Sequence, residues 1–189
     1  MKEIIGKVIV ISAPSGTGKT TILNSVLKEF PEIVFSVSAT TRAKRNSEKD
    51  GVDYYFISEE KFLKMISDNE FLEWEKFYDY YYGTFKKFVE DTIKKGSSVI
   101  IEVDVKGAIS IKNNYPDASL IFIEPPSVEE LINRLKNRNT ESESDFNKRV
   151  NRAKMELNQK DKFDYFVLNE NLEEAIVNLK SLIKKIIKE

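Results

Sequence analysis

Near the start of the chain, a strand-like run leads into a glycine-rich turn and then into a helical pattern. The run, Lys7–Ser12, is almost continuously apolar and β-branched, as is typical of a strand buried on both faces in a parallel sheet. The same character returns later in the chain, near stretches of helical periodicity, at Val99–Val103, Leu120–Ile123 and Tyr165–Leu168. Strands that alternate with helices predict an α/β fold with a parallel sheet and helices on both of its faces.

The alternation breaks between residues 33 and 84. Short aromatic-rich runs such as Asp53–Ile57 surround one predicted helix there, with Ser58 as its expected N-cap. This pattern predicts a small β-rich insertion, so that residues 1–32 and 85–189 together form the core domain.

The composition excludes several kinds of chemistry. The 189 residues include no Cys and no His, which rules out disulfides, thiol and imidazole catalysis, and metal sites that need these ligands. Lys and Arg number 30 and Asp and Glu 31, and this balance predicts no nucleic-acid partner. No apolar stretch approaches the roughly 18 residues of a membrane span, and no signal-peptide layout is present. We therefore expect a cytoplasmic protein without a membrane partner, whose chemistry depends on charged groups and hydroxyls, as phosphoryl transfer does.

The glycine-rich turn matches the phosphate-binding loop pattern G-x-x-x-x-G-K-[ST], with alanine in place of the first glycine. Its residues are Ala13, Pro14, Ser15, Gly16, Thr17, Gly18, Lys19 and Thr20. The glycines let backbone N–H groups converge on phosphate oxygens, and the start of the following helix adds to that positive field. Lys19 supplies a cation for the β- and γ-phosphates, and the Thr20 hydroxyl can ligate Mg²⁺. The preceding strand and the intact Gly-Lys-Thr argue against a chance glycine turn, so the loop predicts a nucleoside triphosphate ligand but no particular reaction.

Two arginines three residues apart, Arg42 and Arg45, follow a second strand-like stretch and are flanked by hydroxyl side chains. Guanidinium groups at this spacing suit a phosphate monoester, because each can bind two of its oxygens at once. A solvent-exposed charged loop explains the same residues equally well, so this segment alone leaves both interpretations open.

Two carboxylates, Glu102 and Asp104, stand near the carboxyl end of the buried run Val99–Val103. The carboxyl ends of parallel strands are where α/β folds bind their ligands, and strand alternation puts both side chains on one face. The alternative is that the two acids only cap the next turn.

A polar, acidic segment lies between arginines in the last third of the chain. The arginines that bracket it are Arg134, Arg138, Arg149 and Arg152. We expect residues from about 134 to 152 to form a lid that closes over a nucleotide and excludes water. Helix-surface arginines paired with nearby acids are the alternative interpretation.

These segments occur in an order that resembles the guanylate kinases, enzymes that phosphorylate GMP with ATP. The family's motifs match this chain at Ser36–Phe56, Phe71–Trp74, Tyr82–Thr84, Ile121–Ser127 and Arg134–Arg138. The first follows S-x-S-x-T-T-R-x-x-R-x-x-E-x-x-G-x-D-Y-x-F, and the next two follow F-[LI]-E-W and Y-G-[ST]. The likeness extends from about Val8 to the carboxyl terminus, and so many motifs in order make coincidence negligible.

The resemblance implies a GMP site formed mainly by the insertion. The residues that would hold the GMP phosphate are Arg42, Arg45, Tyr54 and Tyr82. Glu73 would accept hydrogen bonds from the guanine N1–H and N2–H₂ donors, while Ser38 and Thr84 would contact the base edge. Glu102 would lie near the same nucleotide. Adenine reverses the donor–acceptor pattern of guanine, so the resemblance implies discrimination against adenine.

The resemblance also implies a site for ATP and Mg²⁺ in the core. The phosphate loop and Asn169 would contact ATP, and Thr20 and Asp104 would lie at the Mg²⁺ that accompanies it. Three basic residues would be catalytic, because their charges reach the transferring phosphoryl group: Lys19, Arg138 and Arg149.

The chain departs from the family pattern at a few positions. The usual D-[IV]-D-x-Q-G is altered by Glu102 and Lys106, a Pro and a Gly are replaced by Lys44 and Ser47, and a lid Gly is replaced by Asn139. The changes at positions 44, 47 and 139 remove no predicted ligand group.

Two other functions are alternatives to an active guanylate kinase. Some family members are inactive modules that bind phosphorylated partners, but these usually lack the phosphate loop and lid arginines, which this chain retains. A kinase for another monophosphate, such as AMP or dTMP, is disfavoured by Glu73 together with Ser38 and Thr84. We therefore predict an ATP:GMP phosphotransferase that acts on GMP or dGMP, as a monomer or a weak homo-oligomer.

Overall fold

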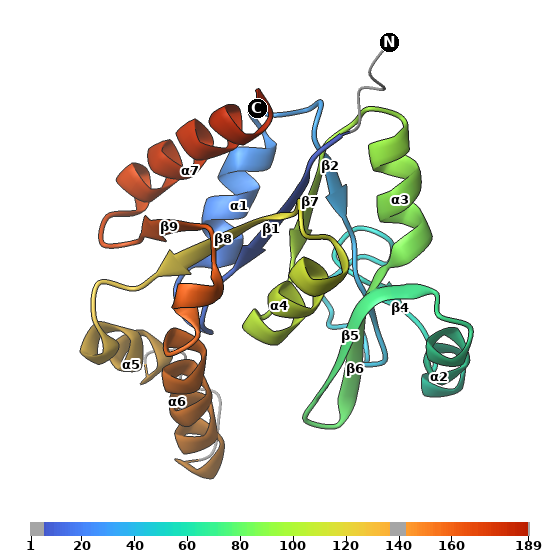
Figure 1. Ribbon diagram of the computed structural model, residues 1–189. Coiled ribbons are helices and arrows are strands. Elements are labelled where there is room, and N and C mark those ends of the chain that lie inside the picture. Colours follow the sequence, from blue (N-terminus) through green and yellow to red (C-terminus); the bar gives the residue numbers. More distant parts are fainter. Residues whose placement is uncertain (1–5, 137–142, 189) are drawn as a thin grey trace.

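The computed structural model describes residues 6–136 and 143–188, and its centre is a five-stranded parallel sheet (Figure 1). The strands lie in the order β2-β7-β1-β8-β9. Their bounds are β1 Val8–Ser12, β2 Val34–Ser36, β7 Val99–Glu102, β8 Ser119–Glu124 and β9 Tyr165–Leu168. The predicted α/β fold with a parallel sheet is confirmed.

Helices cover both faces of this sheet. Their bounds are α1 Lys19–Leu27, α3 Lys86–Lys94, α4 Val105–Asn114 and α7 Leu172–Ile186. Ile9 and Ile11 of the central strand β1 pack with α1 and α7 on one face. Val8 and Val10 pack with α3 and α4 on the other face. All four side chains are buried, which explains why the strand is apolar at every position and not only at every second one.

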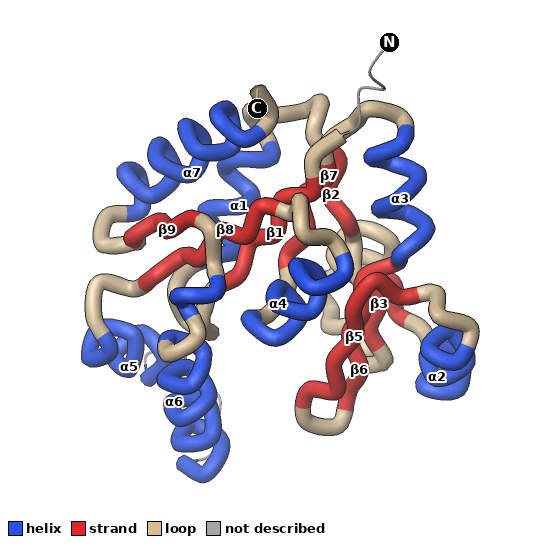
Figure 2. Tube along the Cα trace, viewed as in Figure 1, coloured by secondary structure: helices blue, strands red, loops and turns tan. Residues whose placement is uncertain are grey.

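A second, smaller sheet lies beside the first, with strands in the order β4-β3-β6-β5 (Figure 2). Its strands are β3 Ala39–Thr40, β4 Tyr55–Phe56, β5 Phe71–Phe77 and β6 Tyr80–Phe85, and the helix α2 Glu59–Ser67 lies between β4 and β5 in the chain. The Ser58 hydroxyl accepts a hydrogen bond from the Lys61 N–H at 3.2 Å, so it caps α2 as expected. Phe62 of α2 is fully buried and stacks on Phe71, with ring centroids 4.3 Å apart. This segment is therefore rich in β structure around one helix, as the sequence predicts.

The strand β2 lies within residues 33–84 but belongs to the main sheet and not to the second one. It pairs in parallel with Val99–Ile101 of β7. Three residues are too few for strand alternation to show, so the local pattern does not separate β2 from the aromatic runs that follow it. The second sheet begins only at β3.

The segment after β8 contains α5 Val128–Lys136, α6 Glu143–Leu157 and a short 3-10 turn, η1 Lys160–Lys162. Helices α5 and α6 pack on one another through Leu131, Leu135 and Ala153 at one end of the main sheet (Figure 1). Ser127 accepts a hydrogen bond from the Glu130 N–H at 3.0 Å and so begins α5. In the part of the chain that the structure describes, no helix has the length and apolar character needed to cross a bilayer.

Candidate active site

A cavity of about 1160 Å³ opens where the main sheet ends at its carboxyl edge and extends to the second sheet. The predicted site residues that line it are the phosphate loop (Ala13–Thr20), Ser38, Arg42, Arg45, Tyr54, Glu73, Tyr82, Glu102, Asp104 and Arg149. Thr84 and Asn169 are buried and do not line the cavity themselves, but each is hydrogen-bonded to a residue that does. Arg138 falls outside the described residues. Segments far apart in the sequence thus meet in one cavity.

The phosphate loop has the backbone that its sequence predicts. Gly16 and Gly18 have φ angles of 93° and 82°, in the left-handed region that favours glycine, and Gly18 is the N-cap of α1. Ala13, which replaces the usual first glycine, has no positive φ and therefore fits without strain. A Cβ on Gly16 would lie 2.9 Å from a methyl carbon of Leu135, so α5 also packs directly against this loop.

Asn169 stabilises the phosphate loop through a side-chain hydrogen bond. Its side-chain Nδ2 donates to the carbonyl oxygen of Thr17 at 2.5 Å, and the Thr17 hydroxyl donates to the carbonyl of Pro14 at 2.8 Å. Asn169 is 4% exposed. In this structure its side chain therefore contacts the loop itself, and a contact with ATP stays a prediction.

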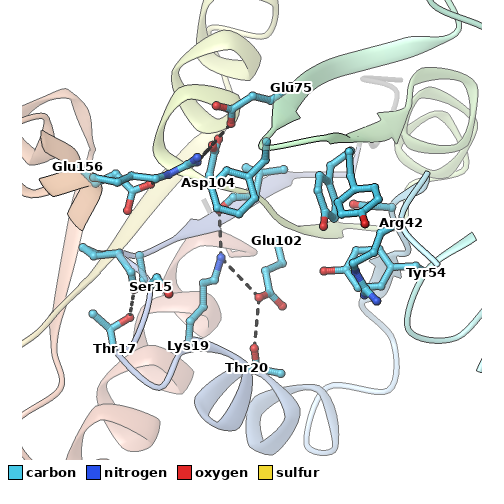
Figure 3. A pocket seen from close by; sticks show the side chains of 18 of the residues that line it. Ser15, Thr17, Lys19, Thr20, Arg42, Tyr54, Glu75, Glu102, Asp104 and Glu156 are labelled. Atoms are coloured by element: carbon cyan, nitrogen blue, oxygen red, sulfur yellow. Dashed lines mark hydrogen bonds and ion pairs between the residues drawn. The ribbon is translucent and has the colours of Figure 1, made fainter. Parts of the chain in front are cut away.

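Lys19 joins the loop to the end of β7 (Figure 3). Its Nζ donates to the carbonyl oxygen of Val103 at 3.1 Å and lies 3.4 Å from Oε1 of Glu102. The Thr20 hydroxyl donates to the same Glu102 oxygen at 3.4 Å. Glu102 is thus the carboxylate that the structure brings to the phosphate loop.

Asp104, the other predicted metal residue, makes different contacts. It is the N-cap of α4, and its Oδ1 accepts the Gly107 N–H at 2.7 Å. Its Oδ2 accepts a hydrogen bond from the Arg152 guanidinium. The capping alternative for this acid is therefore observed, although Asp104 also lines the cavity.

The two predicted phosphate-binding arginines lie in an ordered loop built around Glu48. Arg42 binds Glu48 through both terminal nitrogens at 2.7 and 3.0 Å, and the backbone N–H of Arg45 donates to Glu48 at 2.8 Å. These bonds lower the pKa of Glu48 to about 2 and raise the pKa of Arg42. Lys44, at the position of the family's proline, donates to the Glu48 carbonyl at 3.1 Å. The side chains of Arg42 and Glu48 are each only 13% exposed, which argues against the alternative of a solvated charged loop at Arg42, whereas Arg45 is exposed.

Two tyrosine rings lie close to Arg42 and form a cluster with it. The Arg42 guanidinium lies 5.5 Å from the centroid of Tyr54, and the Tyr54 and Tyr82 rings are 6.0 Å apart. Burial raises the pKa of Tyr54 to about 12, so its hydroxyl keeps its proton and can donate a hydrogen bond.

Glu73 is a buried carboxylate at the far side of the cavity. It stands opposite Thr84 in the β5–β6 hairpin, and the Thr84 hydroxyl donates to its Oε1 at 2.7 Å. Burial raises the pKa of Glu73 to about 7, the Thr84 hydrogen bond opposes that rise, and the charge of Asp104 adds to it. With Oε1 bonded to Thr84, Glu73 can still accept further hydrogen bonds, as a carboxylate with two oxygens can.

The family model for guanylate kinase matches residues 5–186 of the chain. The chain belongs to the guanylate kinase family. A guanylate kinase of Thermotoga maritima is 47% identical over 179 residues, which cover 95% of this chain and 86% of that protein. A guanylate kinase of Caldanaerobacter subterraneus is 46% identical over 178 residues, 94% of this chain and 86% of that protein. The crystal structure of guanylate kinase from Anaplasma phagocytophilum superposes with a TM-score of 0.82 and 32% identity, covering 100% of this chain and 90% of that one.

The sequence predicts no contacts for several residues that line the cavity: Glu75, Phe77, Arg152 and Glu156. Arg152 is one of the predicted lid arginines, but the motif that contains it does not identify its partners. Two spacings could have indicated that Glu156 pairs with Arg152 and that Glu75 and Phe77 face the cavity. Glu156 follows Arg152 by one helical turn, and Glu75 and Phe77 follow Glu73 on the same face of a strand.

Proposed function

We infer that the protein transfers the γ-phosphoryl group of ATP to GMP or dGMP and releases ADP and GDP or dGDP. The observation that carries this inference is the cavity itself, which has a phosphate loop at one side and the buried carboxylate Glu73 at the other. The Arg42 and Tyr54 cluster also lines it. The family membership supports the same reaction.

In the donor half of the site, the loop N–H groups and Lys19 would bind the phosphates of ATP. The Thr20 hydroxyl and a Glu102 carboxylate oxygen lie 3.4 Å apart beside the loop, and oxygen atoms are the ligands that Mg²⁺ prefers. These two residues therefore fit Mg²⁺, which when bound neutralises charge on the β- and γ-phosphates. Asp104 is bonded to Arg152 and Gly107, so its proposed role at the ion rests on the resemblance alone.

In the acceptor half, the GMP phosphate would be held by Arg42, Arg45, Tyr54 and Tyr82. Glu48 supports this role because it fixes the Arg42 guanidinium against the Tyr54 ring. Glu73 would accept the guanine N1–H and N2–H₂ hydrogen bonds, with Thr84 and Ser38 at the base edge. Adenine would leave Glu73 buried without those donors, and such a mismatch discriminates strongly.

The transfer itself needs no side-chain base, because the acceptor phosphate is already largely ionised near neutral pH. A GMP phosphate oxygen attacks the γ-phosphorus in line, a new P–O bond forms, and the bond to the β-phosphate oxygen breaks as ADP leaves. Lys19 and Arg149 would stabilise the charge of the transition state. Arg149 already reaches the phosphate loop, where its Nη2 donates to the Ser15 hydroxyl at 2.9 Å. Arg138 is proposed for the same task on the resemblance alone.

A coupled assay that compares GMP, dGMP, AMP and IMP tests the proposal. We expect turnover with GMP and dGMP, and a loss of guanine preference in Glu73→Gln. Lys19→Ala should reduce kcat roughly 100-fold or more while the circular dichroism spectrum is unchanged. Comparable rates with AMP would contradict the role of Glu73, and no turnover with any monophosphate would favour the phosphopeptide-binding alternative. The cytoplasmic setting and a monomeric or weakly oligomeric state are further expectations.

A further inference from the structure

One face of α6 touches both halves of the cavity. Arg149, Arg152 and Glu156 are spaced three and four residues apart, so they share this face of the helix. Arg149 bonds to Ser15 in the phosphate loop, on the ATP side. Arg152 reaches the β5–β6 hairpin, which carries Glu73. The helix therefore contacts the phosphate loop and the hairpin that carries Glu73 at the same time.

Arg152 makes four contacts that join three parts of the fold. Its Nη2 lies 3.4 Å from Glu75 Oε2 in β5 and also donates to Asp104, the N-cap of α4. Its Nε donates to Glu156 within α6 at 2.7 Å. The guanidinium carbon lies 4.1 Å from the centroid of the Phe77 ring, also in β5. Figure 3 shows Glu75, Asp104 and Glu156 converging on this point.

The guanidinium of Arg152 supplies the positive charge in a cluster of three carboxylates. Arg152 faces three carboxylates, and their side chains are 23% exposed or less, so water screens them only partly. Burial raises the pKa of Glu156, and the bond to Arg152 opposes that rise. Lys106 lies 3.7 Å from Glu75 but is 75% exposed and reaches neither Asp104 nor α6 in this structure. Without Arg152, the three acids would repel one another and α6 would lose this ion pair with the hairpin.

Arginine suits this place better than lysine does. A planar guanidinium can donate from separate edges to different carboxylates and also lie over an aromatic ring. Glu73, Glu75 and Phe77 alternate along β5 and share one face of the strand. A displacement of this strand at the guanine end is therefore passed directly to the partners of Arg152.

We propose that Arg152 is a positioning residue that couples GMP binding to ATP binding by fixing α6, and with it Arg149, relative to the β5–β6 hairpin. This inference rests on the proposed function. Coupling between two sites is reciprocal, so each nucleotide raises the affinity for the other by the same factor.

Calorimetry on the full chain tests the coupling. The dissociation constant of a non-hydrolysable ATP analogue with Mg²⁺ is measured in the absence of GMP and again with saturating GMP. The dissociation constant of GMP alone is measured as well. In the parent protein we expect GMP to tighten analogue binding by about fivefold or more. In Arg152→Met, GMP should change the dissociation constant of the analogue by less than about twofold, while the dissociation constant of GMP alone changes little. Arg152→Lys should recover only part of the coupling.

Matched variants separate this role from a structural one. Glu75→Gln and Phe77→Leu attack the same link from the hairpin side, so they test the inference even if Arg152→Met fails to fold. Lys106→Met removes a charge beside Glu75 without touching α6 and should leave the coupling factor unchanged.

Two results would overturn the inference: a parent protein whose two affinities are independent, or an equal loss of coupling in Lys106→Met. An inactive parent protein would instead contradict the proposed function, so the two failures can be told apart.

Discussion

At the level of single residues, the surroundings of Glu73 determine the energy of its charged form. The side chain is 7% exposed, and the groups that stabilise its charge are the hydroxyl and the backbone N–H of Thr84, both of them neutral. A carboxylate in this setting has lost water without gaining a counter-ion, which raises its pKa. The N–H donors of a guanine base would give the Glu73 carboxylate further hydrogen bonds.

This environment predicts a pH dependence of stability. The pKa of Glu73 is about 7 in the folded protein and near 4.5 in its ordinary state. Between these values the folded state binds more protons than the unfolded state does, so stability falls as pH rises and the loss is complete above pH 7, at about 3 kcal/mol. Glu73→Gln removes this dependence.

Thermal unfolding of both proteins from pH 4 to pH 8 checks this expectation. The melting temperature of Glu73→Gln should rise relative to that of the parent as the pH increases, and the effects of other titrating groups cancel in the difference. A difference that stays constant across this range would show that Glu73 is not destabilised by its burial.

At the level of elements, the start of α4 and the strand β5 set the position of Glu73 together. A Cβ on Gly107, in the first turn of α4, would lie 2.9 Å from Glu73 Oε2 and 3.2 Å from Asp104 Oδ1. Alanine is a better helix former than glycine by about 1 kcal/mol, so the helix itself would gain from the substitution. Glycine at this place therefore serves the site rather than the helix.

Gly107→Ala is accordingly expected to leave the free energy of unfolding within about 1 kcal/mol of the parent value. It should raise the KM for GMP, because Glu73 has to move by a few tenths of an ångström, and leave the KM for ATP unchanged. Steady-state kinetics with each substrate varied in turn measures both constants. An unchanged KM for GMP would mean that Glu73 does not bind the base.

At the level of the whole molecule, the main sheet and the second sheet each supply one half of the cavity. Lys19 and the phosphate loop belong to the core, whereas Glu73, Arg42 and Tyr54 belong to the segment that holds the second sheet. When each nucleotide is bound alone, a substitution in one half should therefore weaken the ligand of that half and spare the ligand of the other.

Ligand-induced shifts in melting temperature test this separation. A nucleotide present at 100 times its dissociation constant should raise the melting temperature by about 5–10 °C. Lys19→Ala should lose most of the shift with the ATP analogue and keep the shift with GMP, and Glu73→Gln should do the opposite. A variant that loses both shifts equally would indicate that its substitution damages the fold as a whole.

Much of the fold and site could be predicted where the determinant is local. The phosphate loop follows from glycines that tolerate positive φ, and β1 follows from an apolar run that only a sheet covered on both faces can bury. Thr20 is predicted as a metal ligand from the phosphate-loop motif, and Asp104 is predicted as one from the family resemblance. Neither source could show that Glu102 reaches Thr20 while Asp104 caps α4, because a side chain's partner depends on its rotamer and on neighbouring elements.

Local conformation and the order of motifs were thus readable from the amino acids alone, and they were enough to place the chain in its family. Packing decided the contacts between distant segments. Arg152 meets Glu75 and Asp104 across 77 and 48 residues of chain, and Asn169 meets Thr17 across 152. No periodicity or propensity encodes such a contact, because it exists only after the helices and sheets have buried their apolar faces and brought these residues to one cavity.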